Sequence, residues 1–165
     1  MCGTVLQRII VRSREDVRHF RSDAPYAVIT FVGHRHGRTP PKLLADPNRL
    51  ARIIICADDT YPNIPGSVAL SKAQALRIAR FVKHIAPQID TLVIQCRFGH
   101  GRSCGAAIAV ARAFRLRWQD FIGGERVGNG HVTMAVAQAL ESVGYDCDSA
   151  SAAEYDRLYT DHVKE

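Results

Sequence analysis

Short runs of apolar residues alternate along this chain with longer segments in which apolar residues recur every three or four positions. A short run rich in β-branched residues is typical of a strand that is at least half buried. Four segments have this character and predict strands: Thr4–Val11, which we expect at a sheet edge, Tyr26–Val32, Arg52–Cys56 and Thr91–Gln95.

The longer segments predict helices, because their apolar residues fall at helical spacing. Ser13 is followed by acidic residues, which suits the first turn of a helix. Ser71 and Gln74 match a capping box at the start of another helix. Three more helices are predicted: one after Arg102, one over His131–Val143 and one over Ser151–Val163. Strands that alternate with helices indicate an α/β fold, with a central, mostly parallel sheet and helices on both faces.

Length and composition fit one soluble domain. The 165 residues are 47% hydrophobic and 23% charged, and a chain of this length buries a core without disulfide or metal support. No apolar run reaches the roughly 18 residues of a membrane span, and the N-terminus lacks the apolar core of a signal peptide. We therefore expect residues 1–165 to form a single cytoplasmic domain with no membrane partner.

Cysteine count and net charge narrow the candidate chemistry. The five cysteines form no CxxC pair, and their odd number argues against a disulfide framework and against a zinc site. The formal charge of +6 favours anionic partners, either phosphorylated substrates or nucleic acid. This charge is scattered, however, and the chain contains no nucleic-acid recognition motif or aromatic stacking patch. Nucleic acid is therefore not the expected partner.

The most informative segment is Val93–Ser103, where a buried strand is expected to end, a loop with two glycines to follow, and a helix to begin. Such a loop points backbone N–H groups inward, and the helix N-terminus adds positive potential, so the geometry suits an anion. Gly99 and Gly101 let the backbone turn with unusual dihedrals. The loop starts with the thiol of Cys96 and ends with the guanidinium of Arg102, which aims both groups at one bound ligand.

Each of these residue types has a chemical role in phosphate transfer. The thiolate form of Cys96 is a nucleophile, and the inward N–H groups, the helix end and Arg102 all favour that form. Arg102 can bind two phosphate oxygens with its planar guanidinium and stabilise the charge that develops on them. Ser103 can donate its hydroxyl to the sulfur when the thiolate leaves. The structural alternative is a buried cysteine before a glycine-rich turn, with Arg102 in an ordinary ion pair.

The sequence CRFGHGRS, from Cys96 to Ser103, resembles the Cys-xx-Gly-xx-Arg-Ser/Thr loop of the protein tyrosine phosphatase superfamily. The chain from Tyr26 to Leu140 is similar to the compact dual-specificity branch, and in particular to small predicted bacterial tyrosine phosphatases. The resemblance implies the cysteine-phosphatase fold and a phosphocysteine intermediate on Cys96. It implies no metal and no cofactor, a phosphorylated protein or peptide as substrate, and binding of phosphate, sulfate or vanadate in the loop.

The resemblance also implies a general acid and a brace for the loop. The acid is expected after the third strand, and the match to the family pattern favours Asp59 over the neighbouring Asp58. One of these two aspartates is expected only to cap a turn. Asn129 matches an asparagine that braces the phosphate loop in the dual-specificity branch, although Gly128 stands where that branch has proline. Asn129 before Gly130 is equally a turn signal.

The remaining expectations concern substrate contacts. The loop residues between the thiol and the guanidinium are expected to contact substrate: Arg97, Phe98, Gly99, His100 and Gly101. The basic stretch from His34 to Arg38 either borders the site or is a solvated loop. The loop lacks the lysines of relatives that act on phosphoinositides, which favours phosphoprotein over lipid. Pocket depth decides between phosphotyrosine and phosphoserine, and the sequence does not reveal it.

Three features leave alternatives open. Gln95 stands where the family usually has histidine before the nucleophile, so a slow enzyme or a silent phosphopeptide-binding module is the second interpretation. A rhodanese-type sulfurtransferase also uses a cysteine loop between strand and helix, but its loop rarely ends in Arg-Ser and needs no Asp59. Cys56 and Cys104 either form a protective disulfide with Cys96 under oxidation or are small buried core residues.

Overall fold

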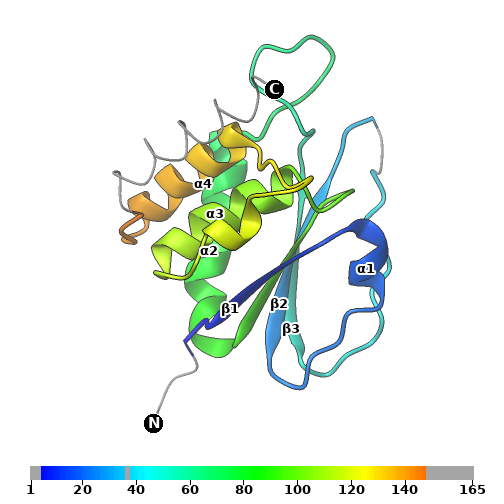
Figure 1. The fold of residues 1–165 in the computed structure, drawn as a ribbon, viewed down its shortest axis with the longest axis vertical. Coiled ribbons are helices and arrows are strands. Elements are labelled where there is room, and N and C mark those ends of the chain that lie inside the picture. Colours follow the sequence, from blue (N-terminus) through cyan, green and yellow to red (C-terminus); the bar gives the residue numbers. More distant parts are fainter. Residues whose placement is uncertain (1–4, 36–37, 148–165) are drawn as a thin grey trace.

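The computed structural model describes residues 5–35 and 38–147. Within this part of the chain, four strands form a single sheet in the order β1-β4-β2-β3 (Figure 1). They are β1 (Arg8–Arg12), β2 (Tyr26–Val32), β3 (Arg49–Cys56) and β4 (Thr91–Gln95). All three strand pairings are parallel, so the predicted α/β fold with a mostly parallel sheet is confirmed.

Helices cover both faces of this sheet (Figure 1). One face carries three helices, α2 (Lys72–Ile85), α3 (Arg102–Ala113) and α4 (Gly130–Ser142), and the opposite face carries the short α1 (Arg14–Arg18). Two short 3-10 helices, Ala86–Gln88 and Gln119–Phe121, complete the described elements. Among the described residues, no helix is long and apolar enough to cross a membrane.

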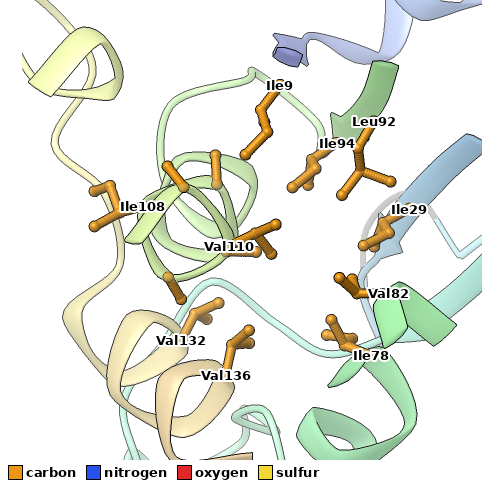
Figure 2. Close-up of a cluster of buried hydrophobic side chains, with 14 of the residues drawn as sticks. Ile9, Ile29, Ile78, Val82, Leu92, Ile94, Ile108, Val110, Val132 and Val136 are labelled. Atoms are coloured by element: carbon orange, nitrogen blue, oxygen red, sulfur yellow. The ribbon is translucent and has the colours of Figure 1, made fainter. Parts of the chain in front are cut away.

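The alternation of side chains along the central strands produces two separate hydrophobic clusters. On the face with three helices, Ile29 of β2 and Ile94 of β4 pack toward Val82 of α2 and Val110 of α3 (Figure 2). On the opposite face, Val28 of β2 joins a smaller cluster that includes the buried residue of α1. The sheet therefore has two apolar faces, which is why the central strands read as continuous apolar runs.

The helix α3 lies at the centre of the larger cluster. Every residue from Arg102 to Arg112 is buried, and most of the interior ones are alanine or glycine. Small side chains let neighbouring backbones approach closely: a Cβ on Gly105 would lie 2.6 Å from the carbonyl oxygen of Asn129. This packing fixes the N-terminus of α3 at the end of β4, where the sequence analysis placed its candidate site.

The predicted boundaries agree best for the central strands. Strands β2 and β4 have the predicted bounds, whereas β3 starts at Arg49 and not at Arg52. The expected edge strand is present, but it covers Arg8–Arg12 and not Thr4–Val11. The capping box is formed, with Gln74 N–H donating to Ser71 Oγ (3.2 Å) and Ser71 N–H donating to Gln74 Oε1 (2.9 Å). The helix predicted over Ser151–Val163 lies outside the described residues.

Candidate active site

The glycine-containing loop between β4 and α3 lies at the carboxyl end of a central strand. The strand β4 ends at Gln95, and α3 begins at Arg102. In parallel α/β sheets, ligands bind in the crevice outside the carboxyl ends of the strands. The loop that follows β3 rises from the same end of the sheet, as the teal segment at the top of Figure 1. The fold therefore brings the two predicted halves of the site to one edge.

The thiol of Cys96 lies at the bottom of this loop, where it is only 2% exposed. The backbone N–H of Gly99 donates to its Sγ at 3.3 Å. The hydroxyl of Ser103 lies 3.0 Å from the same sulfur. Both contacts stabilise a thiolate when the hydroxyl donates, because each then directs a hydrogen toward the sulfur.

Gly99 is required by its conformation and by its neighbours. Its φ of 77° is unfavourable for other residues, and a Cβ there would lie 3.0 Å from the backbone of Arg12 and Ser13. The adjoining Arg14 N–H donates to the carbonyl oxygen of Arg97 at 3.1 Å. The turn between β1 and α1 thus supports the loop from outside, a role that the sequence analysis did not assign to it.

The side chain of Arg102 is only 6% exposed. Its Nη1 donates to the carbonyl oxygen of Ala57 at 2.6 Å, which anchors the side chain to the end of β3. Its Nε is buried and has no hydrogen-bond partner among the described residues. The guanidinium lines the cleft beside the loop, so its remaining N–H groups are positioned to bind an anion there.

The two candidate acids after β3 have different environments. Asp58 accepts hydrogen bonds from the N–H groups of His34 (2.8 Å) and Val68 (2.9 Å), which closes the loop that follows β3. Burial of this carboxyl opposes its ionisation, but these two N–H donors outweigh burial, and with the charges of His34 and Arg102 they lower the pKa of Asp58. Both oxygens of Asp58 therefore already accept a backbone N–H, one from the segment after β2 and one from the loop after β3.

Asp59 is exposed and lies beside the loop from Cys96 to Arg102. Its carboxylate lies against Gly101, so closely that a Cβ on that glycine would collide with it. One of its oxygens accepts a hydrogen bond from Asn129 Nδ2 at 2.8 Å. The structure thus places Asp59 beside the loop, with Oδ1 bonded to Asn129 and Oδ2 against Gly101.

Asn129 connects three parts of the site. Its side-chain amide contacts Asp59, and its Oδ1 accepts from Val132 N–H (3.1 Å) as the N-cap of α4. Its own backbone N–H donates to the carbonyl oxygen of Gly101 at 3.0 Å. The N–H of Gly128, whose φ is 68°, donates in the same way to the carbonyl oxygen of His100 at 3.0 Å. Two successive N–H groups therefore hold the loop at His100 and Gly101.

Two clefts meet at Asp59. The first has a volume of about 380 Å³, and its lining includes Arg102, both aspartates, Arg97, Phe98 and Arg35. Phe98 is 63% exposed, with the Arg97 guanidinium 4.9 Å from its ring centroid. The second, of about 310 Å³, is lined on the other side of Asp59 by residues that include Tyr61, His100 and Val127. His100 therefore borders the second cleft, where it lies 3.6 Å from Glu125, and not the cleft of Arg102.

Gln95 and Cys104 lie behind the loop. Gln95 is 1% exposed and donates from Nε2 to the carbonyl oxygen of Cys96 at 2.7 Å, so it supports the loop from the sheet side. Cys104 donates to the carbonyl oxygen of Gly99 at 3.3 Å, and burial raises its pKa to about 12. It therefore stays a neutral thiol near pH 7. The four described cysteines are all free.

Comparison with known proteins adds little beyond this geometry. No protein-family model matches the chain, and no curated protein matches it. Among solved structures, the chain is similar to Tk-PTP in its active form, with 15% sequence identity and a TM-score of 0.36. The similarity covers 93% of this chain and 90% of that one. At this TM-score it carries no weight for function, which has to be argued from the site.

Proposed function

We propose that this protein is a cysteine-dependent protein phosphatase, of the tyrosine or dual-specificity type, that hydrolyses phosphomonoesters. The observation that carries the proposal is the loop from Cys96 to Arg102, which joins a buried thiol and a buried guanidinium between β4 and α3. A phosphorylated protein or peptide is the proposed substrate, and phosphate, sulfate or vanadate would occupy the same loop.

In the first step, the Cys96 thiolate attacks phosphorus, and the bond from phosphorus to the substrate oxygen breaks. Asp59 donates its proton to that oxygen, so the leaving group departs as an alcohol or phenol. Arg102 and the N–H groups of the loop hold the other phosphoryl oxygens as charge develops on them. The result is a phosphocysteine and an ionised Asp59.

In the second step, a water molecule replaces the departed alcohol. The Asp59 carboxylate takes a proton from this water as the oxygen attacks phosphorus, and the sulfur–phosphorus bond breaks. The sulfur leaves as a thiolate, and Ser103, 3.0 Å away, can donate its hydroxyl to it. Inorganic phosphate is released, and both Cys96 and Asp59 return to their starting protonation states.

A silent phosphopeptide-binding module is the second candidate, because Gln95 is an uncharged side chain directly behind the nucleophile. Both candidates need Arg102 and the inward N–H groups, and only the enzyme needs the thiolate and the acid. The environment of Asp59 favours the enzyme, since its carboxylate lies against Gly101 and is oriented by Asn129.

The test is hydrolysis of p-nitrophenyl phosphate and a tyrosine-phosphorylated peptide by the wild-type protein, with chelator present. We expect turnover that resists the chelator and is inhibited by vanadate. Absence of turnover, with phosphate or vanadate still binding, would favour the phosphopeptide-binding module. Absence of both turnover and oxyanion binding would contradict any phosphate site at this loop.

The two aspartates are expected to differ in a matched pair of variants. Asp59→Asn should slow hydrolysis of an alkyl phosphate, whose leaving group needs a proton, by about 10²-fold, because general acids typically contribute 10²–10⁴-fold. The effect should be smaller for p-nitrophenyl phosphate, whose leaving group is a stable anion. Comparison of kcat for the two substrates measures this, and equal loss on both would contradict the role of Asp59 as acid.

Asp58→Asn should instead reduce stability, because it weakens the hydrogen bonds from His34 and Val68. A loss of about 1 kcal/mol corresponds to a melting temperature lower by roughly 2–4 °C. The folded pKa of Asp58 lies below its ordinary value of 3.8, so its contribution is complete above that pH and is lost as the pH falls below it. The difference between Asp58→Asn and wild type should therefore be constant above pH 5 and should shrink as the pH falls below 3.8. A leaving-group dependence in this variant would reverse the assignment.

A further inference from the structure

The side chain of Gln95 lies next to a second buried polar side chain, on the face of the sheet that carries α1. Gln95 of β4 and Thr30 of β2 are register partners. Two residues earlier on the same strands, Val28 and Val93 both belong to the smaller hydrophobic cluster. Because residues two positions apart share a face, Thr30 and Gln95 lie side by side on that face. Both are at most 1% exposed, so their polar atoms have to find partners inside the protein.

A guanidinium from β3 reaches this polar pair. The Nε of Arg52 donates to Thr30 Oγ1 at 2.9 Å, and its Nη1 donates to the carbonyl oxygen of Pro41 at 3.0 Å. Arg52 forms no ion pair with any described acid, so no carboxylate neutralises its charge there. The hydroxyl of Thr30 accepts from Arg52 and still has its own hydrogen to donate. Beside it, Gln95 Oε1 is buried and has no partner among the described residues.

The other end of the Gln95 amide holds the loop. Its Nε2 donates to the carbonyl oxygen of Cys96 at 2.7 Å. This carbonyl and the N–H of Arg97 belong to one trans, planar peptide, so they point in opposite directions. With the carbonyl held on the sheet side, the N–H of Arg97 faces the inside of the loop. A carbonyl that accepts a hydrogen bond also polarises the N–H of the same peptide, which then becomes a stronger donor.

We propose that Arg52 is a positioning residue for this loop, and that Thr30 connects it to Gln95 by donating its hydroxyl hydrogen to Oε1. This hydrogen bond completes a chain of donors from the guanidinium to the peptide between Cys96 and Arg97. Every donor in the chain is directed toward the loop, so the charge of Arg52 favours an anion there, either a thiolate or a phosphoryl group. The inference rests on the proposed function, because it takes this loop as the phosphate site and Cys96 as the nucleophile.

The test measures alkylation of Cys96 by iodoacetamide across pH. The tryptic peptide His84–Arg97 contains Cys96 as its one cysteine, so mass spectrometry reads this thiol alone. Arg52→Met should lower the rate about fivefold at the acidic end of the profile, which corresponds to about 1 kcal/mol. The alkaline end should be unchanged, because the thiol is ionised there in both proteins. Arg52→Lys keeps the charge and should retain part of the rate.

The shape of the profile separates this role from a structural one. If Arg52 only supported the fold, Arg52→Met would change the rate by the same factor at every pH, and that result would overturn the inference. So would an unchanged rate at the acidic end. The other titratable groups that border the loop or its neighbouring turns are the same in wild type and variant, so their effects cancel in the comparison. They are Arg12, Arg14, Asp58, Asp59, Arg97, His100, Arg102, Cys104, Glu125 and His131.

Thr30→Val tests the inferred link, because valine keeps the shape of threonine and removes its hydroxyl. Thr30→Val should lower the acidic rate about as much as Arg52→Met, and the double variant should lower it no further, since both changes interrupt one chain. Additive losses would mean that Thr30 and Arg52 act independently, which would overturn the link. If Arg52→Met failed to fold, Thr30→Val and Arg52→Lys would still test the chain.

Arg77→Met is the matched control. Arg77 also donates from its guanidinium to β3, to the carbonyl oxygen of Ile54 at 3.1 Å, but it lies on α2 and is exposed. An equal loss in Arg77→Met would overturn the inference. Alkylation needs no substrate, so failure of the proposed function is a separate result. A rate that depends on Arg52 in a protein that hydrolyses no phosphomonoester would support the donor chain and contradict the phosphatase.

Discussion

Cys96→Ser should abolish turnover of every phosphomonoester while the protein still binds oxyanions. A serine hydroxyl ionises far less readily than a thiol, so the attacking anion is lost. Removal of a covalent nucleophile costs about 10⁴ to 10⁶ in kcat in enzymes where the nucleophile and its partners act as a unit, and we expect a loss of at least about 10⁴-fold here. The serine oxygen can still accept the N–H of Gly99, so the loop should keep its shape.

Hydrolysis of p-nitrophenyl phosphate under saturating substrate measures this loss. The control is the rise in melting temperature with inorganic phosphate against chloride at matched ionic strength, since a ligand that binds only the folded state stabilises it. Wild type and Cys96→Ser should show similar rises. Residual activity above about a tenth of wild type would mean that the nucleophile lies elsewhere. Cys104 is a poor substitute, because burial keeps it a neutral thiol, with its pKa raised to about 12.

The central strands could be predicted because both of their faces are buried. In β2 and β4 every residue is buried, so the apolar run and the strand coincide. The edge strands were predicted less well, since β3 mixes buried and exposed positions, and its start at Arg49 carries no apolar signal. At the other edge, Leu6 extended the predicted strand because it is buried in the core, although it lies before the first paired residue, Arg8. Burial and strand pairing are separate properties, and hydrophobic patterning reports only burial.

That the Cys96 thiol and the Arg102 guanidinium lie at one loop could be predicted, because both belong to one contiguous segment between β4 and α3. The contacts made by more distant residues could not be predicted in the same way. The turn at Ser13 packs on Gly99, and the carbonyl of Ala57 anchors Arg102, yet neither residue has side-chain chemistry that points to a site. Backbone groups leave no trace in residue identity, so their part in the site becomes visible only in three dimensions.

Asp58 and Asp59 show a different limit. They are identical in chemistry and adjacent in sequence, so only their surroundings distinguish them. The N–H groups that bind Asp58 come from His34 and Val68, and the amide that orients Asp59 comes from Asn129. His34 and Asn129 are distant in sequence from the two aspartates, and Val68 contributes only a backbone N–H of the loop that follows β3. The roles of the two aspartates stay predictions until the paired variants are measured.

Arg102→Met should remove activity without reducing stability. The buried guanidinium has one hydrogen bond, to Ala57, and its Nε has no partner among the described residues. Burial of a charge costs several kcal/mol in desolvation, and an apolar side chain of similar volume avoids that cost. The lost hydrogen bond to the Ala57 carbonyl opposes this gain and costs about 1–3 kcal/mol. We therefore expect the melting temperature without ligand to be unchanged or higher, while kcat/KM falls by about 10³-fold or more.

Phosphate titrations distinguish this from simple unfolding. The melting temperature of wild type should rise with phosphate, and that of Arg102→Met should not, because the anion loses its bidentate partner. Arg102→Lys keeps the positive charge but not the fork, so it should bind phosphate weakly and remain far below wild type in kcat/KM. If Arg102→Lys instead kept near-full activity, charge alone would suffice at this position. If Arg102→Met melted well below wild type, the guanidinium would stabilise the fold. Its burial at the start of α3 would then be explained by that structural role and not by phosphate binding.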